Sequence, residues 1–125
     1  MASGKYSFVV EQGATTDFEV VWKDSNGDKI DLSGYAARMQ IRSDYGGTLY
    51  ANLSSSLNTD GTGINLSGSN GLVPLSSGSI GIYISAASSS AFTFSEAKYD
   101  LELVNGKTVT RLLEGQIKLS KEVTI

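Results

Sequence analysis

The stretch that decides the fold spans residues 98–113 and reads KYDLELVNGKTVTRLL. Polar and apolar residues alternate on both sides of Asn105-Gly106, a pair that favours the positive φ angles of a tight hairpin turn. A two-residue loop would set residue 104 opposite residue 107 and Asp100 beside Arg111. The opposite face, which we expect to enter the core, carries Tyr99, Leu101 and Leu103. The stretch therefore predicts an antiparallel hairpin with one apolar and one charged face.

The same alternation recurs along most of the chain. Clear runs occupy residues 6–11, 17–23, 36–43 and 79–85, and we expect shorter strands at 49–53, 63–66, 72–75, 115–119 and 123–125. Glycine, asparagine, aspartate and serine separate the runs, as turns require. The only plausible helical turn lies at residues 86–92, and no long window has apolar residues at helical spacing. The pattern predicts an all-β protein, a single-domain antiparallel β-sandwich (Ig-like or jelly-roll-like) with at most one short helical turn.

Length and composition limit the function classes. The 125 residues suit one domain, residues 1–125, and the chain has no cysteine and no histidine. Disulfides, catalytic triads that use histidine and the usual zinc sites are therefore excluded, and we expect no metal and no cofactor. A net charge of −3 without a basic block argues against nucleic-acid binding. The N-terminus does not resemble a signal peptide, and no stretch is long enough to span a membrane.

The acidic residues offer two candidate chemistries. Asp24, Asp28 and Asp31 lie close together, but the spacing lacks the glycine and closing glutamate of a calcium-binding EF-hand loop. We expect solvated turns there, with the three aspartates as candidate contact residues. Glu102 and Glu114 would be the pair for a glycosidase, which needs two carboxylates across a cleft and one raised pKa. Their place on the charged face predicts ion pairs instead, and we expect no enzymatic activity.

The tyrosines are the best candidates for contacts with a partner. Tyr83 lies opposite the face of three isoleucines, and Tyr45 and Tyr50 flank a Gly-Gly turn. Exposed tyrosines fill protein interfaces or stack on sugars. We also expect the strands near the chain ends, at residues 6–11 and 123–125, to present free edges to a neighbouring sheet.

Three segments together resemble a β-sandwich domain recurrent in virion structural proteins of tailed phages (Caudoviricetes). They are residues 6–15, residues 17–42, and residues 99–103 with 111–115 and 122–124. The most specific run is residues 31–42, DLSGYAARMQIR. The resemblance covers most of the chain except the serine- and glycine-rich middle.

This resemblance implies a non-enzymatic virion component made in the bacterial host cytoplasm. Relatives serve in tails, baseplates and fibres or on the head. Because the domain is the whole chain, without a fibre shaft, we expect a small accessory protein: a baseplate, neck or tail adaptor, or a capsid decoration (cement) protein. Its partners would be other virion proteins, bound by a homo-oligomer or by repeated copies, with no small-molecule ligand.

Two alternatives remain. A carbohydrate-binding module that attaches the particle to a surface glycan would show a row of exposed aromatic side chains on one concave face. A carboxylate enzyme would show a cleft with two facing acids, one of them buried with a raised pKa.

Overall fold

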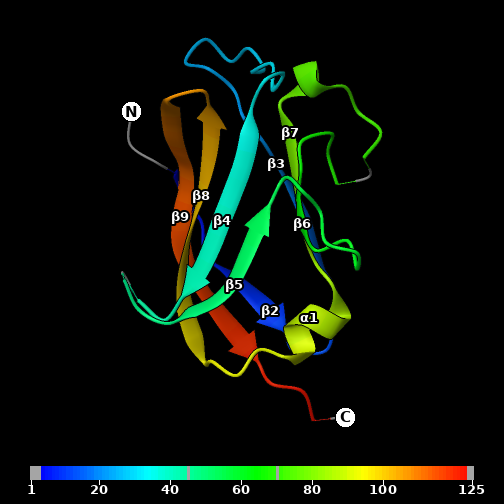
Figure 1. The fold of residues 1–125 in the computed structure, drawn as a ribbon, viewed down its shortest axis with the longest axis vertical. Helices are drawn as coiled ribbons and strands as arrows, with labels where there is room; N and C mark the ends of the chain where they lie inside the picture. The colour runs from blue at the N-terminus through cyan, green and yellow to red at the C-terminus, as the bar shows by residue number, and fades with distance from the viewer. Residues whose placement is uncertain (1–3, 45, 70, 124–125) are drawn as a thin grey trace.

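The computed structural model describes residues 4–44, 46–69 and 71–123, and strands dominate it (Figure 1). In chain order the elements are β1 (Gly4–Lys5), β2 (Phe8–Glu11), β3 (Thr16–Val21), β4 (Ala36–Arg42), β5 (Leu49–Ser54), β6 (Gly63–Asn65), η1 (Leu75–Ser77), β7 (Ser79–Ile84), α1 (Ala86–Ser90), β8 (Glu96–Asn105) and β9 (Thr108–Ser120). The prediction of an all-β sandwich is confirmed. The described residues contain two short helical segments, α1 and the 3₁₀ turn η1, where the sequence predicted at most one.

The strands form two sheets that pack face to face. Sheet A has the order β1-β9-β8-β4-β5, with β2 also paired to β9, and sheet B has the order β3-β7-β6. β1 and β2 run parallel to β9, whereas the other pairings are antiparallel. A three-stranded sheet packed on a larger sheet makes the protein a β-sandwich. The parallel pairing is a departure from the predicted purely antiparallel sandwich.

The core lies between the sheets and comes from the alternating residues that the sequence identified. Ile80, Ile82 and Ile84 of β7 are completely buried, and their partners across the core include Met39, Ile41, Leu101 and Leu103. Successive side chains of a strand point to opposite faces, so the intervening residues of β7 lie on the outer face of sheet B, where Ser79 and Gly81 are also buried. Trp22 is partly buried against this core and meets Tyr35 edge-on at 5.4 Å between ring centroids.

The β8–β9 hairpin forms, but its predicted register is wrong by two residues next to the turn and by three at Asp100, beyond a β-bulge between Leu101 and Glu102. Val104 pairs with Val109 rather than with residue 107, so the loop consists of Gly106 and Lys107. Gly106 has φ = 60° while Lys107 does not have a positive φ, and a positive φ at the first loop position alone is the signature of a type II′ turn. A shift of two residues keeps every side chain on its face. The predicted core face is therefore confirmed despite the wrong register.

The junction between β1 and β2 is fixed from inside the sandwich. Gln116 donates its backbone N–H to the side-chain oxygen Oγ of Ser7. The hydroxyl of Tyr99 donates to the backbone carbonyl of Tyr6. Burial raises the pKa of Tyr99, so its hydroxyl stays protonated and donates. The Tyr6 carbonyl can lie this close to β9 because Gly115 has no side chain: a Cβ there would be 2.1 Å from the carbonyl oxygen. The absence of a side chain at Gly115 and the hydrogen bond from Tyr99 thus keep β1 and β2 close to β9.

The serine- and glycine-rich middle contains two of the three predicted strands. β5 and β6 form close to residues 49–53 and 63–66. The strand predicted at 72–75 is wrong: Leu72 is 84% exposed, and Pro74 caps the turn η1. Proline has no N–H to donate to a ladder, which explains the difference. Val123 is outside any strand and exposed, and residues 124–125 lie outside the described residues.

Candidate functional site

The candidate aspartates of residues 24–31 lie in turns, which Asp24 and Asp31 organise through their carboxylates and Asp28 through its backbone. Asp24 Oδ1 accepts the backbone N–H groups of Asn26 at 2.9 Å and Asp28 at 3.0 Å. Asp31 Oδ1 accepts the backbone N–H of Ser33 at 3.0 Å and its hydroxyl at 2.7 Å, and these bonds lower the pKa of Asp31. All three are exposed, and no group of three or more potential metal ligands occurs among the described residues. The turns predicted here are present, and the aspartates shape them.

The candidate tyrosines do not form one site. Tyr50 stacks on Phe94 with 4.7 Å between ring centroids and packs against the core. Tyr83 lies half-buried on the outer face of sheet B. Tyr45 lies outside the described residues. Among the described aromatic side chains only Tyr6, at 44%, is classed as exposed, so this part of the chain shows no row of exposed rings.

Tyr83 lies in a hollow of about 210 Å³ on the outer face of sheet B. Gly63 and Gly81 leave room for loops to cross the sheet on either side of the ring: a Cβ on Gly81 would meet Ser69 Cα at 2.6 Å. Asp17 is paired with Tyr83 across β3 and β7 and also lines the hollow. The hollow therefore combines one aromatic ring, glycine backbone and a carboxylate.

Asp60, at the rim of this hollow, connects two loop segments by hydrogen bonds, a role that the sequence did not predict. Its Oδ2 accepts the hydroxyls of Ser85 at 2.6 Å and Ser88 at 2.8 Å, and its Oδ1 accepts the N–H of Thr62 at 2.9 Å. These bonds, led by that from Ser85, lower the pKa of Asp60 strongly. Ser85 also caps α1 by accepting the Ser88 N–H. The carboxylate thus ties the loop before β6 to the start of α1, and the Asp60-Gly61 turn was the only local signal.

The outer face of sheet A carries the acids proposed above as a glycosidase pair. Arg38 Nε lies 2.7 Å from Glu102, and Lys5 pairs with Glu114. Arg111 contacts Glu114 at 3.4 Å and Asp100 at 3.5 Å. The Asp100–Arg111 contact predicted from the sequence is present, although the residues directly opposite each other are Asp100 and Glu114.

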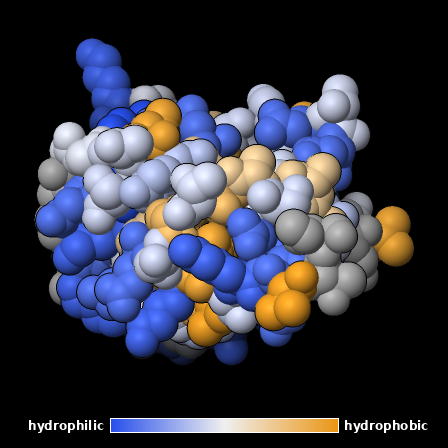
Figure 2. Space-filling model, turned by 90° about the horizontal axis from the view of Figure 1, so that it is seen from below, coloured by the Kyte–Doolittle hydropathy of each residue, from blue (hydrophilic) through white to orange (hydrophobic). Residues whose placement is uncertain are grey.

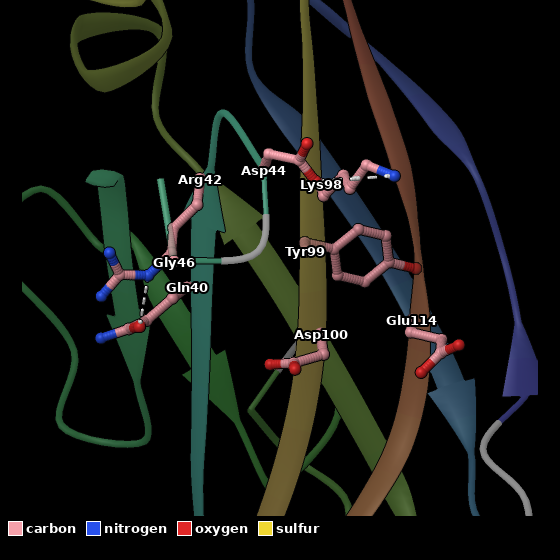
Figure 3. Close-up of a pocket in the computed structure, with 8 residues that line it drawn as sticks. All are labelled: Gln40, Arg42, Asp44, Gly46, Lys98, Tyr99, Asp100 and Glu114. Atoms are coloured by element: carbon pink, nitrogen blue, oxygen red, sulfur yellow. Dashed lines mark hydrogen bonds and ion pairs between the residues drawn. The ribbon is translucent and has the colours of Figure 1, made fainter. Parts of the chain in front are cut away.

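The pKa of the Asp100 carboxyl group is raised above its usual value. Burial is the largest cause, followed by the charge of Glu102, while Arg111 partly offsets both. Next to Asp100 lies a shallow pocket of about 200 Å³, shown in Figure 3. In it Arg42 donates to Gln40, and Asp100 and Glu114 project from neighbouring strands. The two acids lie side by side on one sheet face and share Arg111, which differs from two carboxylates facing each other across a cleft.

Apolar side chains at the surface are scattered. Figure 2 shows the lower end of the sandwich, where hydrophilic atoms interrupt the apolar ones. The larger exposed apolar residues come from several elements and include Val9, Val21, Leu57, Leu72 and Val109. Neither helical segment of the described residues is long and apolar enough to cross a membrane.

Comparison with protein-family models gives no match, and neither does comparison with curated proteins. The chemistry of the site must therefore be argued from the residues above.

Proposed function

We propose that the chain is a non-enzymatic structural component of a tailed-phage virion, located in the particle after synthesis in the host cytoplasm. It would act as a baseplate, neck or tail adaptor or as a capsid decoration protein, through protein–protein interfaces and in repeated copies. The observation that carries a docking role is that Asp24, Asp31, Glu102 and Glu114 already hold turns or ion pairs, while the β3 edge of sheet B has no second strand paired to it among the described residues.

The phage assignment rests on the resemblance of residues 6–15, 17–42 and the β8–β9 region. Its most specific run, residues 31–42, forms a turn and then β4, a central strand of sheet A. Tyr35 donates its N–H to the Leu32 carbonyl in that turn at 3.0 Å. Residues 31–42 therefore help to build the sandwich itself, as a sequence shared within one structural domain family should. This supports a resemblance at the level of the fold.

One observation favours the carbohydrate-binding alternative. The Tyr83 hollow has an aromatic ring beside Asp17 and the amide of Asn65, and such groups can stack on a sugar ring and bind its hydroxyls. Against it, the described residues lack the row of exposed rings that an extended glycan would need. A glycan array separates the readings: binding that Tyr83→Ala abolishes supports the sugar site.

Immunogold labelling of purified phage particles from the source tests the main proposal. Label over the head assigns a decoration protein, and label at the tail or its tip assigns an adaptor or baseplate protein. If particles carry no label and a blot of them shows no band, the proposal is wrong.

A further inference from the structure

One edge of sheet B is a strand that pairs on one side only. Among the described residues β3 pairs only with β7, as β5 at the edge of sheet A pairs only with β4. β3 is six residues long, from Thr16 to Val21. A sheet edge of this length presents backbone groups ready to pair with another extended chain.

The alternation of hydrogen bonds along β3 shows which of its backbone N–H and C=O groups do not bond β7. Trp22 donates its N–H to the Gly78 carbonyl at 2.9 Å, which continues the β3–β7 register. In an antiparallel pair the residues that bond the partner alternate with those that point away. Residues 16, 18 and 20 therefore bond β7, and the N–H and C=O groups of Asp17, Glu19 and Val21 point outward. No backbone bond from the outward groups of these three residues is formed within the described part of the chain.

The charge beside this edge selects the partner. The side chains of Asp17 and Glu19 lie on the outer face of sheet B, where Asp60 rims the adjacent hollow. The strands of sheet B contain no lysine or arginine, nor does any residue from 43 to 97.

A second copy of β3 is a poor occupant of the edge. Antiparallel pairing of two β3 strands would bring the aspartates and glutamates of both copies onto one face, and like charges opposite each other destabilise a sheet. Lysine or arginine at alternate positions of a different chain would instead lie beside Asp17 and Glu19.

The inner side of the edge is lined by apolar and aromatic side chains. Phe18 and Val20 face the core from β3, and the ring of Tyr6 lies 5.6 Å from that of Phe18. Tyr6 keeps 44% of its surface exposed. A strand added to β3 would turn every second side chain inward, next to Tyr6.

We propose that the β3 edge binds an extended segment of a protein partner that alternates basic residues, facing outward, with apolar residues, facing inward. The partner adds a strand to sheet B, and the two carboxylates select its charge. This inference rests on the proposed docking function and names its surface, but its test uses the isolated chain. If the chain is absent from virions, the proposed function is wrong but the peptide result still stands. If the peptide does not bind, this inference is wrong but the proposed function still stands.

The probe is the acetylated, amidated peptide Thr-Val-Lys-Val-Lys-Val, which places its lysines opposite Asp17 and Glu19 in antiparallel pairing. The control peptide has glutamine for both lysines. Hydrogen exchange followed by NMR should show new protection at the amides of Asp17, Glu19 and Val21 only, since those of Phe18 and Val20 already bond β7. The control peptide should bind about two- to thirty-fold more weakly, because it loses two cross-strand charge pairs.

Matched variants separate the edge charges from overall charge. Asp17→Asn/Glu19→Gln should weaken binding of the lysine peptide by the same factor. Glu11→Gln/Asp28→Asn removes two exposed charges elsewhere and should leave binding unchanged. Equal binding of both peptides overturns the proposal, as does binding without protection of the three amides, or no binding at millimolar peptide. Protection of those amides without peptide, together with a dimer in ultracentrifugation, would assign the edge to a second copy and overturn it too.

Discussion

Substituting Gly115 with alanine tests how the first strands are held against β9. The new Cβ would lie 2.1 Å from the Tyr6 carbonyl oxygen, whereas ordinary contacts begin at 3.4 Å, so the β1–β2 junction must move by more than an ångström. This overpacks the site and breaks the Tyr99–Tyr6 hydrogen bond. Overpacking costs roughly 1–3 kcal/mol and the bond about 1 kcal/mol, so we expect a loss of about 2–4 kcal/mol in the free energy of unfolding.

Urea unfolding followed by the fluorescence of Trp22, the only tryptophan, measures the effect. Gly4→Ala is the matched control, because its Cβ would meet the flexible end of Leu113 at 3.2 Å and the Leu112 carbonyl oxygen at an ordinary contact distance of 3.5 Å. Tyr99→Phe removes the hydroxyl alone, and combining it with Gly115→Ala should cost about 1 kcal/mol less than the sum of the single losses, because the bond is lost once. A loss below about 0.5 kcal/mol for Gly115→Ala, or strict additivity with Tyr99→Phe, would refute the reasoning.

Three further predictions follow from burial and charge. The lowered pKa of Asp60 means that its contribution to stability is present above the usual aspartate pKa of about 3.9 and fades as pH falls below it. Asp60→Asn should therefore destabilise the protein at pH 7. It should also reduce the loss of stability that follows when pH falls below the usual aspartate pKa, and an unchanged loss would contradict the prediction. Ile82→Ala should cost about 2–5 kcal/mol in urea unfolding, whereas Leu72→Ala should stay within about 0.5 kcal/mol. Arg111→Ala should lower stability by no more than about 1 kcal/mol, and by less in high salt, because its ion pairs are half exposed.

Local patterns in the sequence carry much of the fold. Alternation in residues 36–43 and 79–85 identified both the strands and their buried faces, because the period of two depends only on the pleat. The turn at Asn105-Gly106 was found, but its register was wrong because Gly106 takes the first loop position. Nothing local distinguishes a type I′ turn with Asn105 in the loop from the observed type II′ turn.

Long-range features could not be predicted in the same way. The parallel pairing of β1 and β2 with β9 joins opposite ends of the chain. The alternation of polar and apolar residues in a strand does not show which other strand it pairs with. The bonds from Ser85 and Ser88 to Asp60 depend equally on tertiary contact. The tyrosines were chosen by residue type, yet Tyr50 turned out to stack on Phe94 in the fold. The open edge at β3 became visible only once the strand order was known.

The most direct test of the central claim is the number of copies of this chain per particle. Phage particles purified on a density gradient would be digested, and peptides of this chain would be quantified by mass spectrometry against the major capsid protein. A structural component should co-migrate with infectious particles at one fixed ratio in every preparation. A chain that stays in the soluble lysate, or whose ratio to capsid protein varies between preparations, would contradict the claim.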